Sequence, residues 1–245
     1  LYKDGRYEAT LLALPETQRR QLLEGDWDVV SGQEFSEFRR SIHTCAPFEI
    51  PRDWIRFRSC DYGYSTWSAV HWYAIDPNFG TLYVYRELYV TRHTARQLAH
   101  LVLEAERDER VLYGVLDSSC WHTRGNTGPS IAEEMAREGC LWKPSDRSQG
   151  SRTAGKNRIH ELLMVDPGTN LPGILFFDTC RKIIATLPSI PSDPRGFDDV
   201  DPKFRDDHDY DSLRYGVMSR PHHWLGYRKS PAKRAFRPAD PVFGY

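Results

Sequence analysis

The sequence predicts an α/β protein in which helices cover a mixed central β-sheet. Residues 54–91 hold runs of aromatic and β-branched residues, with a Pro-Asn-Phe-Gly turn between two of them, a pattern typical of paired strands. Residues 94–110 carry apolar side chains at helical spacing. Further along the chain, apolar runs alternate with helical segments, as expected when helices pack on the faces of a sheet.

The strands follow one another in chain order. "WIRFRSCDYG" (54–63) is a short strand that ends at Asp61, and "WSAVHWYAID" (67–76) and "GTLYVYRELYV" (80–90) form a hairpin. "VLYGVLD" (111–117) is an apolar run that suits a strand buried on both faces. We expect two further short strands in "CLWKP" and "GILFF".

Helices are predicted between and after these strands. "PSIAEEMAREG" begins with proline and ends with glycine, the asymmetry expected at the two ends of a helix. "RIHELLMV" and "DTCRKIIATLPSI" are also helical, and a last helix begins within "FRDDHDYDSLRYG" (204–216). "SDRSQGSRTAGKN" (145–157) is expected to be a basic loop.

The composition excludes several classes of protein. The chain has 245 residues, 40% hydrophobic and 27% charged, with a net charge of −1, which is typical of a soluble globular protein. No apolar run approaches the roughly 20 residues that span a bilayer, and no signal peptide opens the chain. The five cysteines lack the spacing of a zinc site or a disulfide framework. We therefore expect neither a membrane protein nor a secreted one.

The domain organisation is predicted from changes in composition. Residues 1–50 are expected to be a linker, 51–220 the main domain and 221–245 a basic tail. From Arg220 onward there are six Lys or Arg and one acidic residue, Asp240. The chain begins with Leu1 rather than methionine, so we expect it to be a fragment of a longer protein.

Several carboxylates occur where elements begin or end. Asp61 and Asp117 each end a predicted strand, and Asp207, His208 and Asp211 open the last helix. Each aspartate alone is explained by a turn or a helix cap. Together they favour a divalent-cation site, because carboxylate oxygens are the preferred ligands of such ions and strand ends lie at the rim of the sheet. Asp61 suits a ligand shared by two ions.

One segment is similar to a nucleotide-binding loop. "GSRTAGKN" (150–157) nearly matches the G-x-x-x-x-G-K-[ST] motif. Its last position is Asn157, which has no hydroxyl for Mg²⁺, and no buried strand precedes it. We therefore do not predict nucleotide binding there.

The order of these motifs resembles a known family. The matching segments are "LLEGDWDVVSGQEFSEF", "CDYGYSTWSAVHWYAID", "GVLDSS" and "DDHDYDSLRYG", which run from about Leu22 to Arg220. They resemble the C-terminal nuclease domain of the large terminase subunit of tailed bacteriophages. The resemblance implies an RNase H-like fold and a DNA endonuclease that uses two Mg²⁺ or Mn²⁺ ions.

The resemblance also implies which residues act. Asp61, Asp117 and Asp207 would be catalytic metal ligands, with His208 and Asp211 as further ligands. Asp206 and Asp209 remain alternatives to Asp207. Four basic residues are expected to contact DNA phosphates, and Arg214 is expected to pair with the acidic cluster; the four are Arg147, Arg152, Lys156 and Arg158.

The implied role is cleavage of concatemeric double-stranded viral DNA during packaging. The implied partners are the portal protein, the small terminase subunit and the protein's own N-terminal packaging ATPase, and the implied place is the host cytoplasm, on the procapsid. Two alternatives stay open. One is another RNase H-like nuclease, a junction resolvase or ribonuclease, and the other is a DNA- or partner-binding module without activity.

Overall fold

The computed structural model describes residues 32–107, 109–123, 128–193, 200–201 and 204–220. Their centre is a seven-stranded sheet in the order β1-β9-β4-β3-β2-β5-β6. Its strands are β1 (Thr44–Cys45), β2 (Ile55–Asp61), β3 (Trp67–Ile75), β4 (Leu82–Thr91), β5 (Val111–Leu116), β6 (Lys143–Pro144) and β9 (Ile174–Phe177). A separate antiparallel pair consists of β7 (Val165–Asp166) and β8 (Leu171–Pro172).

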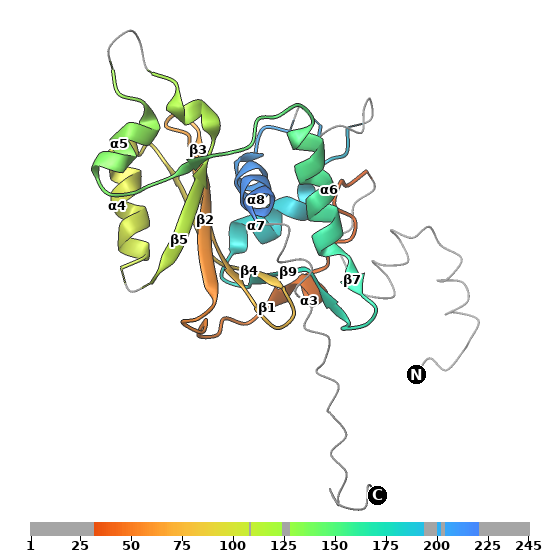
Figure 1. Ribbon diagram of the computed structural model, residues 1–245. Coiled ribbons are helices and arrows are strands. Elements are labelled where there is room, and N and C mark those ends of the chain that lie inside the picture. The colour runs from red at the N-terminus through yellow and green to blue at the C-terminus, as the bar shows by residue number, and fades with distance from the viewer. Residues whose placement is uncertain (1–31, 108, 124–127, 194–199, 202–203, 221–245) are drawn as a thin grey trace, which may run out of the picture.

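Helices cover both faces of this sheet. They are α3 (Arg40–His43), α4 (Ala95–Ala105), α5 (Ile131–Arg137), α6 (Ser151–Leu163), α7 (Arg181–Thr186) and α8 (His208–Ser219), with 3-10 turns η1 (Ser118–Trp121) and η2 (Leu187–Ser189). In Figure 1, α4 and α5 lie on one side of the sheet, and α6, α7 and α8 lie on the other. The predicted fold class is therefore confirmed.

The sheet is mixed in the way that the sequence predicts. The strands β2, β3 and β4 pair antiparallel, which confirms the hairpin. On either side of them, β5 pairs parallel with β2, and β9 pairs parallel with β4. Because β2 and β5 run in the same direction, their carboxyl ends lie at the same edge of the sheet.

Part of the core lies between the sheet and α8. Phe57 of β2 stacks on Tyr73 of β3 and on Tyr113 of β5, with ring centroids 4.7 and 5.1 Å apart. Tyr210 and Leu213 of α8 are fully buried against this face. The final helix is thus held by apolar packing, and its polar side chains take their directions from that packing.

The N-terminal part of the described chain belongs to the same core. Phe35 and Phe38 are fully buried, and β1 pairs with β9 at the edge of the sheet. Residues 33–45 therefore pack with the main domain, although the sequence pattern assigns them to the linker. Residues 1–31 of the predicted linker and the predicted basic tail (221–245) lie outside the described residues.

The prediction of a loop at 145–157 is correct for residues 145–150 and wrong for residues 151–157. Helix α6 begins at Ser151, seven residues before the predicted helix, and Gly150 at its N-cap has φ +81°. The sequence pattern does not indicate this helix start, because the segment contains two glycines and several polar residues. Glycine is unfavourable in the interior of a helix. The P-loop-like segment is therefore mostly helical.

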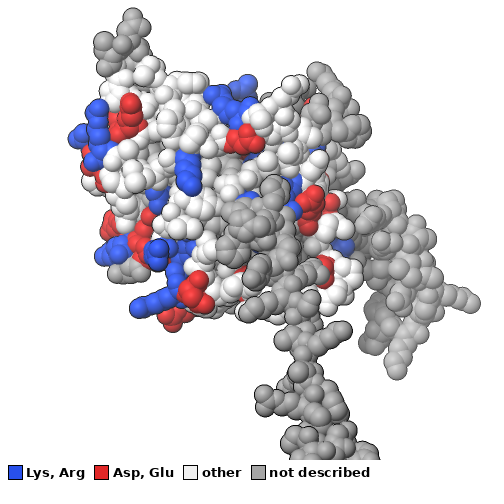
Figure 2. Space-filling model, in the orientation of Figure 1, with Lys and Arg blue, Asp and Glu red and all other residues white. Residues whose placement is uncertain are grey.

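Other features agree with the compositional analysis. All five cysteines are free, and four of them are buried. Among the described helices, none has the length and apolar character needed to cross a bilayer. On the face shown in Figure 2, basic and acidic side chains are interspersed.

A buried cluster of charges joins the N-terminal segment to α6 and makes stability depend on pH. The imidazole of His160 contacts Glu34 (3.2 Å) and Glu37 (2.9 Å), and Lys156 also pairs with Glu34. Hydrogen bonds to Glu34 and Glu37 raise the pKa of His160 to about 9. Because this value lies above the unfolded value near 6.5, the contribution is complete below about pH 6.5 and is lost as the pH rises through 9.

We expect His160→Gln to remove about 2–3 kcal/mol of stability at neutral pH and to flatten the decline between pH 6.5 and 9.5. Urea unfolding at several pH values would measure both effects. His100→Gln, at an exposed histidine, is the matched control. An unchanged pH profile in His160→Gln would contradict this account.

Candidate active site

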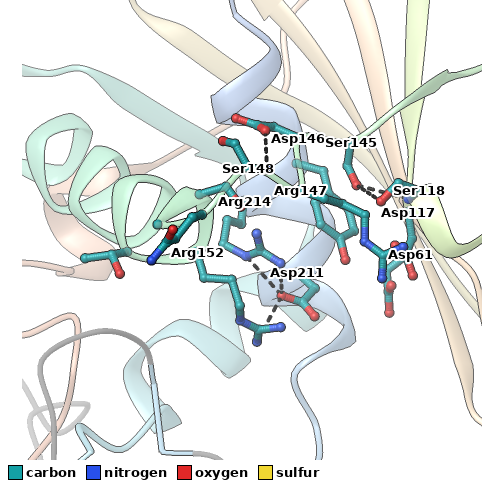
Figure 3. Close-up of a pocket in the computed structure, with 15 residues that line it drawn as sticks. Asp61, Asp117, Ser118, Ser145, Asp146, Arg147, Ser148, Arg152, Asp211 and Arg214 are labelled. Carbon is teal, nitrogen blue, oxygen red and sulfur yellow. Dashed lines mark hydrogen bonds and ion pairs between the residues drawn. The ribbon is translucent and has the colours of Figure 1, made fainter.

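A pocket of about 710 Å³ opens at the sheet edge where β2 and β5 end. Four carboxylates line it: Asp61 from the end of β2, Asp117 just after β5, Asp211 from α8, and Asp146 after β6. Figure 3 shows these side chains, with Arg152 and Arg214 beside Asp211. The structure thus brings together residues that are 150 positions apart in the sequence.

Backbone pairing places the first two carboxylates side by side. The N–H of Asp117 donates to the carbonyl of Cys60 over 3.2 Å, so the ladder between β2 and β5 continues to the residue before Asp61. Asp117 also caps η1, because its carboxylate accepts hydrogen bonds from the backbone N–H and the hydroxyl of Ser119. The cap explanation therefore holds for Asp117, and the same residue also lines the pocket.

The first turns of α8 supply the other polar groups. Nδ1 of His208 donates to Oδ2 of Asp61 over 2.7 Å. Oδ1 of Asp211 accepts from Arg214, with Nη2 at 2.7 Å, and lies 3.8 Å from Nη2 of Arg152. The expected pairing of Arg214 with the acidic cluster is thus confirmed.

The pKa of Asp61 reflects its burial and the closeness of other carboxylates in the pocket. Burial raises the pKa of Asp61 to about 6; the hydrogen bond from His208 opposes this rise, and the charges of Asp211 and Asp117 add to it. The hydrogen bond to Asp61 raises the pKa of His208. A carboxylate that is costly to ionise next to two others is one that a bound cation would stabilise.

The donor set fits a hard divalent cation. Asp61, Asp117 and Asp211 offer carboxylate oxygens around one open cavity, and His208 lies in contact with one of them. Mg²⁺ and Mn²⁺ take such ligands and keep several waters, so three carboxylates are enough. These residues could therefore hold the predicted ions.

The other acidic residues before and in α8 do not line the pocket. Asp207 occupies the N-cap position, where its side chain makes no cap hydrogen bond, and it does not line the pocket. Burial and then the charge of Asp211 raise its pKa, so it lies within electrostatic reach of the site. Asp206 binds Lys182 and Tyr89, and Asp209 is buried beneath the helix, away from the pocket.

The four predicted DNA contacts divide into two pairs. Arg147 and Arg152 line the pocket. Lys156 is buried in its ion pair with Glu34, and Arg158 pairs with Glu161 and lines a different cavity. Only the first pair is placed to meet a phosphate in the candidate site, because Lys156 and Arg158 form ion pairs away from this pocket.

One pocket residue was missed that the same signal could have found. Asp146 lies two residues after β6, whose parallel pairing with β5 brings it to the same edge of the sheet. Its carboxylate accepts from the backbone N–H of Ser148, which lowers its pKa. Ser118, Ser145 and Tyr215 also line the pocket, and nothing in the sequence pattern singles them out.

A glycine sets how closely α6 approaches the site. A Cβ at Gly155 would lie 2.4 Å from Cγ of Arg214, the residue that holds Asp211. We expect Gly155→Val to cost about 1–3 kcal/mol of stability, because Arg214 or the whole helix must move. Urea unfolding would measure this cost, with Ala154→Val at an exposed neighbour as the control. Equal stability of the two variants would contradict the close packing.

Comparisons with known proteins show which solved structures share this fold. The sequence matches no protein-family model and no curated protein. Among solved structures, the P22 large terminase nuclease domain is similar with a TM-score of 0.61 and 20% identity, over 77% of this chain and 92% of that one. The large terminase nuclease of the thermophilic phage G20c with bound magnesium gives 0.54 and 16%, over 78% and 98%.

A longer terminase is similar as well. The large terminase of another thermophilic bacteriophage, in complex with ADP, gives a TM-score of 0.63 and 16% identity. The match covers 89% of this chain and 52% of that protein, so this chain spans about half of the longer terminase. From its sheet order, its flanking helices and these matches, the chain has the RNase H-like fold of phage large terminase nuclease domains.

Proposed function

We propose that this chain is the nuclease domain of a phage large terminase, a metal-dependent endonuclease that cuts double-stranded viral DNA during genome packaging. The observation that carries the proposal is the meeting of Asp61, Asp117 and Asp211 in one open pocket of this fold. The G20c nuclease has been solved with bound magnesium and with bound cobalt, which supports metal binding by a domain of this fold.

Three carboxylates would hold the ions: Asp61, Asp117 and Asp211. Asp207, which lies near Asp211, remains a further candidate ligand, as does His208. When bound, Mg²⁺ or Mn²⁺ would lower the pKa of a water and offset the charge of the leaving oxygen.

Neighbouring residues would orient these ligands and the DNA. His208 holds one oxygen of Asp61 through its hydrogen bond and would thereby fix the orientation of that carboxylate. Arg214 holds Asp211 in place by a bidentate contact to one oxygen. Arg147 and Arg152 would attract a backbone phosphate into the pocket without reading sequence, because phosphate contacts position the duplex but carry no base information.

The wider role belongs to the same proposal. The longer terminase was solved with ADP and with ATP-gamma-S, and this chain corresponds to about half of it. We therefore propose that the domain acts together with a packaging ATPase on the same polypeptide. Its other partners would be the portal and the small terminase subunit, on a procapsid in the host cytoplasm.

Nicking and linearisation of a supercoiled plasmid test the nuclease activity. The reaction is run with Mn²⁺, Mg²⁺, Ca²⁺ or EDTA, for the parent chain, Asp61→Ala and Asp117→Ala. Asp53→Ala, at an exposed position, is the control. We expect cleavage with Mn²⁺ or Mg²⁺ that both site variants lose and the control keeps.

Other outcomes point to the alternatives. Cleavage that persists in both site variants would exclude this pocket as the active site. Preference for a four-way junction or an RNA–DNA hybrid over linear duplex would indicate a resolvase or a ribonuclease. DNA binding without cleavage, unchanged in Asp117→Ala, would indicate a binding module.

A further inference from the structure

A second group of metal-ligating side chains lies beneath the first turn of α8. It consists of His71 from β3, Glu87 from β4 and Asp209 from α8, and one ligand atom from each lies within 4.8 Å of the others. None of these residues lines the pocket that holds Asp61. We call this group the inner cluster.

The strand register creates the inner cluster. His71 and Glu87 are directly paired across β3 and β4, so their side chains project from the same face of the sheet. The helix α8 packs on that face and brings Asp209 over the pair. His71 and Asp209 are 0% and 1% exposed, so both lie out of solvent.

One nitrogen of the buried imidazole is left without a partner. Nδ1 of His71 lies 3.0 Å from the hydroxyl of Ser212, which itself contacts the hydroxyl of Ser59. Nε2 is buried and makes no hydrogen bond within the described part of the chain. It lies 3.6 Å from Oδ1 of Asp209, which is too long for a hydrogen bond. The unpartnered nitrogen therefore points into the carboxylates.

Burial also keeps this imidazole neutral. It lowers the pKa of His71 to about 3, so Nε2 can offer a lone pair when Nδ1 donates to Ser212. Such an outer contact is how proteins orient a histidine that ligates a metal through its other nitrogen.

The two carboxylates are oriented by other contacts. Both oxygens of Glu87 accept backbone N–H bonds at the start of α7, from Lys182 (2.7 Å) and Ile183 (3.1 Å). Oδ2 of Asp209 accepts from the hydroxyl of Thr186 over 3.3 Å, so Oδ1 is the oxygen that faces His71. The ammonium of Lys182 is engaged with Asp206 instead. The inner cluster thus contains two acids and a neutral imidazole close together.

We propose that the inner cluster binds a divalent metal ion of the zinc class, separate from the ions of the proposed active site. One imidazole nitrogen with two carboxylate oxygens is a ligand set that suits Zn²⁺. Bonds of roughly 2.0–2.2 Å place ligand atoms about 3.5 Å apart, so ligand atoms that now lie up to 4.8 Å apart would draw together by about 1 Å when the ion binds. The ion would fasten α8 to β3 and β4 and so steady the helix that carries Asp211.

The test uses a protein in which two of the three proposed pocket ligands are absent. In the Asp61→Asn/Asp117→Asn double variant, stripped of metal with a chelator, we expect one Zn²⁺ per chain by isothermal titration and by metal analysis after gel filtration. Saturating Zn²⁺ should raise the melting temperature by roughly 5 °C or more. Co²⁺ in place of Zn²⁺ should give a visible absorption band, whose strength reports the coordination geometry. Because two of the three pocket carboxylates are already removed, and the variants below locate the bound ion, this result stands whether or not the chain is a nuclease.

Added variants identify the ligands. In the same background, His71→Gln and Glu87→Gln should each lose the bound Zn²⁺, the thermal shift and the Co²⁺ band. His100→Gln removes a surface histidine that lies 3.2 Å from Glu138 and should lose none of them. Glu87 is only partly buried, so its variant covers the case in which His71→Gln does not fold. No stoichiometric Zn²⁺ in the double variant, or unchanged binding in both cluster variants, would overturn the proposal.

Discussion

Asp211→Asn is expected to lower plasmid cleavage by roughly 1000-fold or more, because a ligand that offsets transition-state charge through a metal is worth several kcal/mol. Asparagine keeps the size of the side chain and one oxygen that can still accept from Arg214, so the change removes chiefly charge. The measurement is the single-turnover rate in Mn²⁺ and in Mg²⁺. The expected loss exceeds that in Asp207→Asn, because Asp211 lines the pocket and Asp207 does not.

Two further variants complete this comparison. Asp206→Asn should retain most of the activity, because that carboxylate is turned toward Lys182 and Tyr89. Thermal melting of each variant would separate a lost ligand from a lost fold. If Asp207→Asn abolishes cleavage and Asp211→Asn keeps most of it, Asp207 is the third ligand and our placement of the site is wrong.

Glu106→Ala is expected to produce the largest loss of stability, about 3–5 kcal/mol, because it leaves a buried arginine without its counter-ion. Both oxygens of Glu106 accept from Nη1 of Arg58, at 3.0 and 2.7 Å, and Oε1 also accepts from Nε1 of Trp72 at 2.6 Å. Arg58 is 5% exposed and lies over the ring of Trp142. Urea unfolding of the parent and the variant would measure the loss.

The double variant Arg58→Met/Glu106→Leu distinguishes charge from packing. Replacing both partners by apolar groups should recover most of the lost stability, since the unpaired charge is then gone. Glu104→Ala, which breaks an exposed pair with Arg107, should change stability little. A small effect of Glu106→Ala would mean that water or another group reaches Arg58 easily.

Much of the candidate site follows from local pattern. Asp61 and Asp117 each come directly after an apolar run. The pattern of apolar residues in the sequence indicates where such a strand ends. The hairpin was equally predictable, because its turn residues lie between two aromatic runs. These predictions depend on neighbours in the sequence, and the structure places both aspartates in one pocket.

Helix starts and helix phase were harder to predict. The polar segment 145–157 looks like a loop, but α6 begins at Ser151 because Gly155 lets it pack against Arg214. That packing turns Lys156 inward to Glu34, while Arg152 remains at the pocket. No local signal distinguishes these two cations, since only the rotation of α6 about its axis decides which one faces the pocket.

By itself, the sequence determined the α/β class, the hairpin, and the presence of carboxylates at two strand ends and in a final acidic helix. Only the tertiary structure decided which acidic residue of that helix lines the pocket and which one belongs to the inner cluster. Asp211 enters the pocket, while Asp209 turns toward His71 beneath the helix. The reason is that burial of Tyr210 and Leu213 sets the rotation of α8, and contacts across the whole sheet determine that burial.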